Sequence, residues 1–140
     1  MTLRRLSAAD FPHIARLLAA YKAEIGEHAP DEAALMRLER AISEGTIQFY
    51  GCEDGGAPLG MCSICTTFST FDCRIGGVLE DFYIRPQERH RGIARQLVAF
   101  AREQSGVSTL TVGCADCDVE LYQAIGFRAK IGNLMAWNQE

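Results

Sequence analysis

The sequence predicts a single α/β domain, and three observations lead to that prediction. First, its 140 residues are enough for one domain to bury a core, and 48% of them are hydrophobic while 23% are charged. Second, apolar residues at helical spacing alternate with short apolar runs that are typical of strands. Third, no linker and no internal repeat divides the chain. We therefore expect one domain over residues 1–140, with the element order β-α-α-β-β-β-α-β-α-β.

The first third of the chain predicts a strand followed by two helices. Residues 2–7 form a candidate strand, and its last residue forms with Asp10 a pattern that resembles a capping box. The first helix then keeps its apolar residues at helical spacing and ends near Gly26. A second helix begins near Asp31 and ends at Gly45.

The rest of the chain predicts five more strands and two more helices. Glycine-rich stretches separate the first strands as turns, and a proline closes the third strand of the group. The expected elements are strands over 46–52, 59–68 and 78–86 with turns at 53–58 and 72–77, then a helix over 92–104, a strand over 109–114, a helix over 118–126 and a strand over 128–137.

Charge and hydropathy argue against several classes of protein. The net charge of −4 disfavours a nucleic-acid partner, because such proteins usually carry a basic face. No apolar run is long enough to cross a membrane, and the first residues lack the apolar segment of a signal peptide. We therefore expect a cytoplasmic protein without a membrane or nucleic-acid partner. The acidic balance is compatible with a cationic small-molecule substrate.

Six cysteines include two C-x-x-C pairs, at residues 62–65 and 114–117. Residues 66–113 separate the pairs, which is far more than the spacing of a zinc ribbon. In a strand, Cys62 and Cys65 also point to opposite faces. We therefore expect no metal site and reduced thiols that pack as small hydrophobic side chains. A zinc site is the alternative.

The segment before the third predicted helix has the features of an anion-binding loop. Gly92 stands where the helix begins, although glycine is disfavoured in helices by about 1 kcal/mol relative to alanine. The first N–H groups of a helix lack partners and carry partial positive charge, so a pyrophosphate can bind them where side chains leave room. Gly92 and Ala94 leave that room. Positive charge beside it comes from Arg89, Arg91 and Arg95. An ordinary basic helix start is the alternative.

These residues resemble the motifs of the GNAT N-acetyltransferase superfamily. Arg89, Gly92 and Ala94 match the family signature Q/R-x-x-G-x-G/A, and "LYQAIGF" at 121–127 is similar to its later L-Y-x-x-x-G-F segment. The element order also matches nearly end to end. The resemblance implies a mixed sheet of about six strands flanked by helices, and a homodimer is compatible with it.

The resemblance further implies acetyl-CoA as cosubstrate and no metal. In that family the signature loop binds the pyrophosphate. The preceding strand, splayed from the next by a bulge, offers backbone groups to the pantetheine arm. The residues that would bind acetyl-CoA are Phe82, Tyr83, Ile84, Arg89, His90, Arg91, Gly92, Ile93, Ala94, Arg95 and Tyr122.

Two residues are candidates for the chemistry of acetyl transfer to an amine. Many family members place a tyrosine near the cofactor sulfur, so the resemblance makes Tyr122 the acid for the leaving thiolate; packing of its ring is the alternative. Glu80 is the candidate base, because a carboxylate among apolar neighbours is costly unless it is paired or reactive. Those neighbours in phase are Val78, Phe82 and Ile84. For Glu80, an edge charge or a pair with an arginine is the alternative.

The sequence of the predicted strand over 78–86 and of the segment before it resembles particular branches of this family. "TTFSTF" followed by "VLEDFYI" is similar to the polyamine and thialysine acetyltransferase branch and to aminoglycoside acetyltransferase-like members. In the polyamine branch the glutamate of L-E-D-F serves the acceptor amine. The link between the first two helices would line the acceptor pocket, and a solvated loop is the alternative. Its acidic residues are Glu24, Glu27, Asp31 and Glu32.

We therefore expect an N-acetyltransferase that passes an acetyl group directly to a primary amine of a small, cationic molecule. One alternative is a protein N-terminal or lysine acetyltransferase, and another is a sensor that binds acyl-CoA without turnover. The intact loop together with Glu80 and Tyr122 favours catalysis. One departure from the family is "CADCDVE", where many relatives carry an asparagine; Asp116 or Asp118 would cap the last helix instead.

Overall fold

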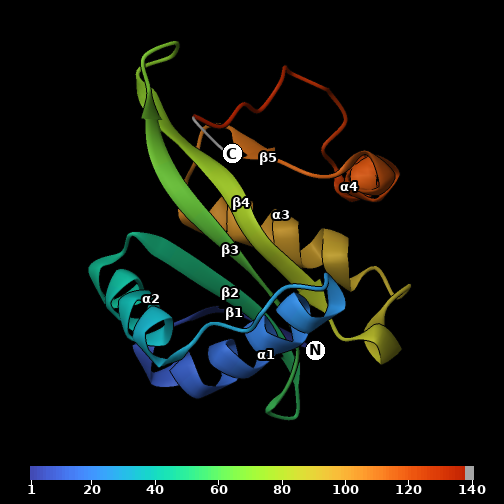
Figure 1. Cartoon of the computed structure of the whole chain (residues 1–140). Helices are drawn as coiled ribbons and strands as arrows, with labels where there is room; N and C mark the ends of the chain where they lie inside the picture. Colours follow the sequence, from blue (N-terminus) through green and yellow to red (C-terminus); the bar gives the residue numbers. More distant parts are fainter. Residues whose placement is uncertain (138–140) are drawn as a thin grey trace.

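The structure is a computed structural model that describes residues 1–137, and it confirms the α/β fold (Figure 1). One mixed sheet contains five strands in the order β1-β2-β3-β4-β5, with β4 and β5 parallel and the other pairs antiparallel. The strands are β1 (Thr2–Leu6), β2 (Ile47–Asp54), β3 (Ala57–Ser69), β4 (Arg74–Ile84) and β5 (Leu110–Val112). The helices are α1 (Phe11–Glu24), α2 (Glu32–Glu44), α3 (Ile93–Ser105) and α4 (Val119–Ile125).

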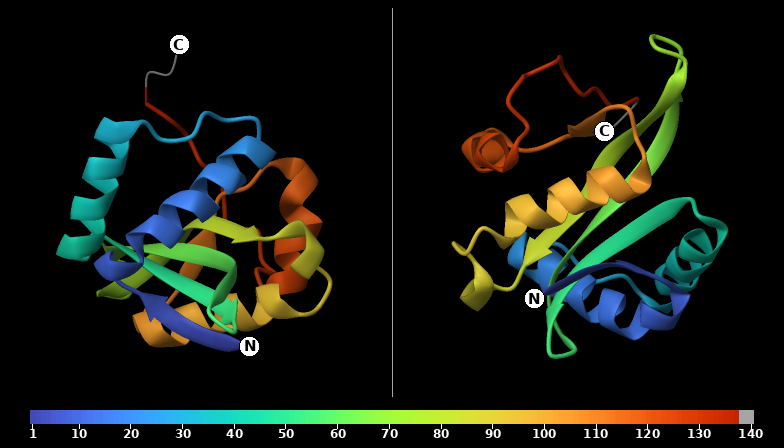
Figure 2. Two further views of the ribbon diagram at one scale, coloured as in Figure 1. Left: turned by 90° about the horizontal axis from the view of Figure 1, so that it is seen from below. Right: turned by 180° about the vertical axis from the view of Figure 1, so that it is seen from behind.

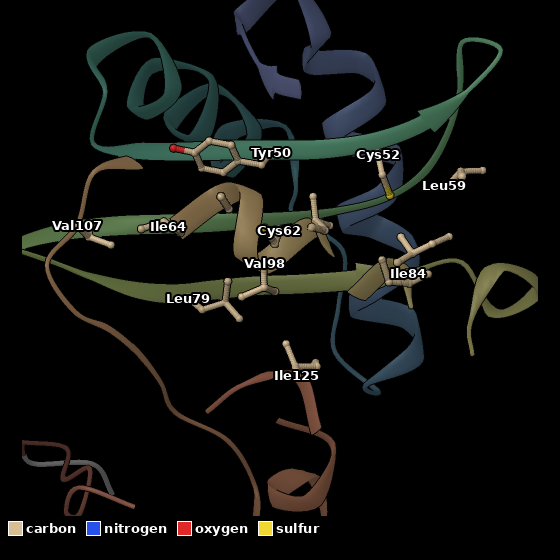
Figure 3. Close-up of a cluster of buried hydrophobic side chains, with 13 residues drawn as sticks. Tyr50, Cys52, Leu59, Cys62, Ile64, Leu79, Ile84, Val98, Val107 and Ile125 are labelled. Atoms are coloured by element: carbon tan, nitrogen blue, oxygen red, sulfur yellow. The ribbon is translucent and has the colours of Figure 1, made fainter. Parts of the chain in front are cut away.

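The sheet separates two hydrophobic clusters. Successive strand residues point to opposite faces, so Phe49 and Met61 pack with α1 and α2, whereas their neighbours Tyr50 and Cys62 pack with α3. Figures 1 and 2 show α3 on the side of the sheet opposite α1 and α2, and Figure 3 shows the cluster under α3. The sheet thus presents two separate faces to the rest of the molecule.

The expected faces of the C-x-x-C strand are confirmed. Cys62 belongs to the cluster under α3, and Cys65 packs against the cluster under α1 and α2. All six cysteines are free thiols. Within residues 1–137, no helix is both long enough and apolar enough to cross a membrane.

Local capping signals account for where the first helices begin. The capping box at Ser7 is present in both directions: the Ala9 N–H donates to Ser7 Oγ at 3.3 Å, and the Ser7 N–H donates to Asp10 Oδ2 at 2.8 Å. Asp31 Oδ1 accepts the Ala34 N–H at 2.8 Å at the start of α2. These predicted starts are confirmed, as is the end of α2 at Gly45.

A β-bulge interrupts the pairing of β3 with β4. Ser63 lies opposite Asp81, but the next residue of β3, Ile64, lies opposite Leu79, which leaves Glu80 as an additional residue in β4. A bulge reverses which side chains face each side of the sheet. Leu79 therefore packs under α3, whereas Asp81 shares the other face with Met61 and Tyr83.

The parallel pairing of β4 with β5 stops beside this bulge. It covers three residue pairs, from Gly77 opposite Leu110 to Leu79 opposite Val112. Beyond Leu79, this edge of β4 has no strand partner among residues 1–137, and the chain after β5 turns away toward α4 (Figure 1). The splaying that the resemblance implied is therefore present.

The predicted turn over 72–77 is wrong from Arg74 onward, because Arg74 already begins β4. Two consecutive glycines suggested the turn, yet Gly77 is required by close packing inside the strand. A Cβ at Gly77 would lie 2.9 Å from Ile64 Cγ2 and 3.0 Å from Val107 Cγ1. The side chains of Ile64 and Val107 pack so closely against Gly77 that a Cβ there would displace them.

The predicted last strand over 128–137 is also wrong, so the sheet has five strands where we expected about six. The apolar residues of this segment do not alternate as a half-buried strand requires. They are Ile131, Leu134, Met135 and Trp137, and all four are exposed.

An ion-pair network fastens β1 to the start of α1. Arg4 donates to both oxygens of Asp10, at 2.7 Å and 3.0 Å, and its Nε donates to Glu53 Oε1 at 3.0 Å. The hydrogen bond from Arg4 lowers the pKa of Asp10 to about 2. An unfolded aspartate titrates near pKa 3.9, so this contribution to stability is complete above about pH 5 and is lost as the pH falls through about 2.

We expect Asp10→Asn to lower the free energy of unfolding near neutral pH by about 1 kcal/mol, because it weakens the cap and the pair with Arg4. The deficit relative to the original protein should shrink steadily between about pH 5 and pH 2. Urea unfolding across that range measures it. Asp54→Asn, at an exposed carboxylate, is the control and should show no deficit. A deficit that does not change with pH would contradict the assignment.

Candidate functional site

The loop between β4 and α3 presents a row of backbone N–H groups without partners. His90 and Gly92 both have left-handed φ values, +65° and +77°. Gly92 precedes α3 without a capping side chain, and its carbonyl accepts the first helical bond, from Gln96 N–H at 3.3 Å. The N–H groups of residues 90–95 donate to no acceptor among residues 1–137. Such a row at a helix start suits an anion such as a phosphate.

The first arginine of this loop is held by the protein itself. Arg89 donates to both carboxylate oxygens of Glu24 at 2.6 Å and 2.7 Å, and its Nε donates to the Ile84 carbonyl at 2.8 Å. Its guanidinium also lies over the Tyr83 ring, 5.7 Å from the centroid. Arg89 therefore ties the end of β4 to the end of α1.

The other two arginines of the loop have protein partners as well. Arg91 forms an ion pair with Glu88, and Arg95 donates to the Ala124 carbonyl at 2.6 Å, which joins α3 to α4. Carboxylates from the same chain offset part of the charge that the sequence suggested for this loop. The unpaired N–H groups are thus its main feature for binding an anion.

Aromatic rings surround Tyr122 where β4 and β5 separate. Its ring lies 6.2 Å from the Phe82 ring and 5.9 Å from the Phe127 ring, both edge to face. Burial raises the pKa of Tyr122 to about 12, and the nearby Tyr21 and Asp118 add to the effect. The phenol therefore keeps its proton throughout the neutral and mildly alkaline range.

Tyr122 is one of the residues that line a cavity of about 750 Å³, and no residue of β4 lines it. The cavity is lined by residues of α3, β5, α4 and the segment that follows α4, and the loop residues 89–95 are not among them. Its volume is within the range of small-molecule sites. Tyr122 thus lies between β4 and a space that could hold part of a ligand.

Carboxylates and a phenol from three elements lie close together next to the bulge. Burial raises the pKa of Tyr21 in α1, and the negative charges of Asp81, Glu80 and Asp118 add to it. The Tyr21 ring lies 6.4 Å from that of Tyr83. Asp118 stands at the start of α4, but its side chain makes no capping hydrogen bond. The combined field of these groups favours a cation.

Glu80 is exposed, which differs from the expected position on an apolar face. The bulge is the reason, because it places both Leu79 and Phe82 on the α3 side and leaves Glu80 outside the alternation. Asp81 is the buried carboxylate of the pair, with 8% of its surface exposed. Two adjacent acids in one strand were the only sequence signal that one of them would be buried.

The acidic link between α1 and α2 is partly used by the fold. Glu24 pairs with Arg89, and Asp31 caps α2. Glu27 and Glu32 are exposed. Within residues 1–137, no three His, Cys, Asp or Glu side chains are grouped so that they could hold a metal ion.

Comparison with protein families finds a match over residues 45–129, to the family described as "Acetyltransferase (GNAT) domain". The matched range contains the bulge, the loop with unpaired N–H groups and Tyr122. A comparison with curated proteins finds no significant match.

Solved structures with the same fold cover nearly all of the chain. A probable acetyltransferase has a TM-score of 0.85 at 19% identity, over 100% of this chain and 99% of that one. An aminoglycoside acetyltransferase from an uncultured soil metagenomic sample, in complex with sisomicin, has a TM-score of 0.84 at 11% identity, over 99% and 95%. A predicted acetyltransferase with acetyl-CoA from Clostridium acetobutylicum has a TM-score of 0.79 at 12% identity, over 98% and 95%. At these identities the likeness shows the fold.

Proposed function

Because the chain belongs to the GNAT acetyltransferase family, we propose that it transfers an acetyl group from acetyl-CoA directly to a primary amine of a small, cationic molecule. The observation that carries the proposal is the row of unpaired N–H groups at residues 90–95, next to the unpaired edge of β4. Together these donors match a ligand with a pyrophosphate and an amide-bearing arm.

The residues present fit this cosubstrate. The N–H groups of residues 90–95 would bind its phosphates, and Gly92 leaves the approach open because only Gln96 Nε2 lies within 4 Å of where a Cβ would be. The backbone of residues 82–84 would bind the arm, because this edge of β4 has no strand partner there. Acetyl-CoA supplies the activated acetyl group.

Two side chains then serve the transfer. Tyr122 keeps its proton at neutral pH and donates it to the departing thiolate, which is the role of a general acid. Glu80 is exposed and accepts the proton that the acceptor ammonium must lose, acting through water. The nitrogen attacks the acetyl carbonyl, the C–S bond breaks, and the products are an amide and the free thiol of CoA.

The small cationic acceptor is supported by charge at the bulge. Glu80, Asp81 and Asp118 lie close to Tyr21, and the chain as a whole carries a net charge of −4. The solved aminoglycoside acetyltransferase bound to sisomicin adds one candidate class of amine. The polyamine class stays a prediction from the L-E-D-F segment.

We expect Gly92→Ala to weaken acetyl-CoA binding by about 10-fold or more, because the left-handed φ strains any other residue and displaces the row of N–H groups. Gly106→Ala is the matched control, at the other end of α3, with φ +68° and open space around it. Isothermal calorimetry should show that Gly106→Ala keeps the original affinity. Equal affinity of both variants for acetyl-CoA would show that the phosphates do not bind this loop.

We expect Tyr122→Phe to lower turnover by about 100-fold while the affinity for acetyl-CoA stays nearly unchanged, because only the proton donor is lost. Tyr50→Phe removes a buried hydroxyl that has no hydrogen-bond partner among the described residues, and it should keep full turnover. Steady-state release of CoA thiol measures both variants. Full activity of Tyr122→Phe would leave its ring a packing role only.

We expect thiol release from acetyl-CoA to be fastest with one cationic small amine. The panel contains spermidine, thialysine, lysine, an aminoglycoside and a short peptide with a free N-terminus. A peptide that exceeds all small amines would favour a protein acetyltransferase. If no amine causes thiol release while acetyl-CoA still raises the melting temperature, the proposed transfer is contradicted and a sensor is favoured.

A further inference from the structure

We propose that Asp81, oriented by Ser63, binds the ammonium group of the acceptor amine. This inference rests on the proposed function and names the residues that would select a cationic acceptor. The structure gives four reasons: a fixed carboxylate, an absent counter-charge, an accessible oxygen and a position at the separation of β4 from β5.

One hydroxyl, that of Ser63, is hydrogen-bonded to both the carboxylate and the backbone N–H of Asp81. Ser63 Oγ donates to Asp81 Oδ2 at 2.7 Å and accepts the Asp81 N–H at 3.0 Å. Ser63 is fully buried and Asp81 is 8% exposed, so little water competes for either bond. The single hydroxyl proton is committed to Oδ2, which orients the carboxylate without neutralising it.

The negative charge of Asp81 has no cationic partner among residues 1–137. The ion pairs of this region use Glu24 and Glu88 instead. A buried carboxylate without a counter-charge is unfavourable, and one hydroxyl offsets only part of its lost hydration. A cation supplied by a ligand would offset the rest.

The second oxygen of Asp81 is available to such a ligand. Asp81 Oδ1 makes no hydrogen bond within residues 1–137. Within that range, Tyr50 Oη is the one side-chain oxygen that is both sealed from solvent and without a hydrogen-bond partner. Because Asp81 Oδ1 also has no partner, it is not sealed from the surface. Asp81 thus has one oxygen held by the protein and one that can accept a hydrogen bond from an ammonium group.

The titratable groups whose pKa the charge of Asp81 affects come from α1, β3 and α4, and none of them is basic. The charge of Asp81 adds to the burial that raises the pKa of Tyr21 in α1, Cys65 in β3 and Tyr122 in α4. It also adds to the raised pKa of Cys62 in β3. Glu80 lies next to it in β4. No basic group among them offsets the charges of Glu80 and Asp81, which suits a cation.

The bulge explains why this carboxylate is at the reacting end of the site. Without the additional residue Glu80, Asp81 would share the α3 face with Leu79. With it, Asp81 points to the face of α1, two residues beyond the last pair between β4 and β5. An ammonium bound at Oδ1 would therefore lie where the two strands separate, near Tyr122.

The test is the Asp81→Asn variant, assayed by steady-state thiol release with the fastest amine of the panel. Asparagine keeps an oxygen that can accept from Ser63 but replaces the charge with a donor amide. We expect the KM for the amine to rise about 10- to 100-fold, which is the loss of one hydrogen bond to a charged group, while the KM for acetyl-CoA stays within about twofold. Asp54→Asn is the control and should change neither KM.

Ser63→Ala is the second variant, and it keeps the test decisive where Asp81→Asn fails to fold. It leaves the carboxylate in place without its orienting bond, so we expect the KM for the amine to rise about 3- to 10-fold with the KM for acetyl-CoA unchanged. Unchanged amine KM values in the folded variants, or equal losses for both substrates, would overturn the inference. No turnover by the original protein with any amine would overturn the proposed function instead.

Discussion

The one additional residue in β4 is the constraint on which the candidate site depends. Glu80 shifts the pairing with β3, so that Leu79 and Phe82 both face α3 while Asp81 faces α1. The parallel pairing with β5 ends at Leu79, directly before it. A regular strand would have continued that pairing and closed the space that the arm of a cosubstrate needs. The bulge thus creates the opening and also selects which acid is buried beside it.

Signals that act within a few residues could be predicted from the sequence, whereas features of strand pairing could not. The capping box at Ser7, the cap at Asp31 and the loop around Gly92 each depend on neighbours in the chain, and the structure contains all three. The bulge depends on β3, which lies far away in sequence. Gly77 shows the same limit, because the close approach of Val107 explains it better than any local turn pattern.

The partners of the charged residues at the site were harder to predict than the positions of those residues in the fold. The sequence predicted Arg89 beside a phosphate, but it could not show that both carboxylate oxygens of Glu24, 65 residues away, already accept from Arg89 Nη2. The same pair gives Arg89 a structural purpose, since it joins α1 to the loop that precedes α3. One ion pair thereby connects α1 to the loop for which we propose phosphate binding.

In the proposed function, the two faces of the sheet bind different ligands. The loop at residues 90–95 begins α3 and serves the face under that helix, whereas Asp81 and Tyr21 belong to the face under α1. Two ligands that approach from opposite faces can meet only where the sheet is open, and it is open where β4 loses β5. Tyr122 lies at that place, and its pKa is raised by burial first and then by nearby groups that include Tyr21 and Asp118. In the proposed function, the separation of these two strands is what brings the thioester, the amine and the proton donor together.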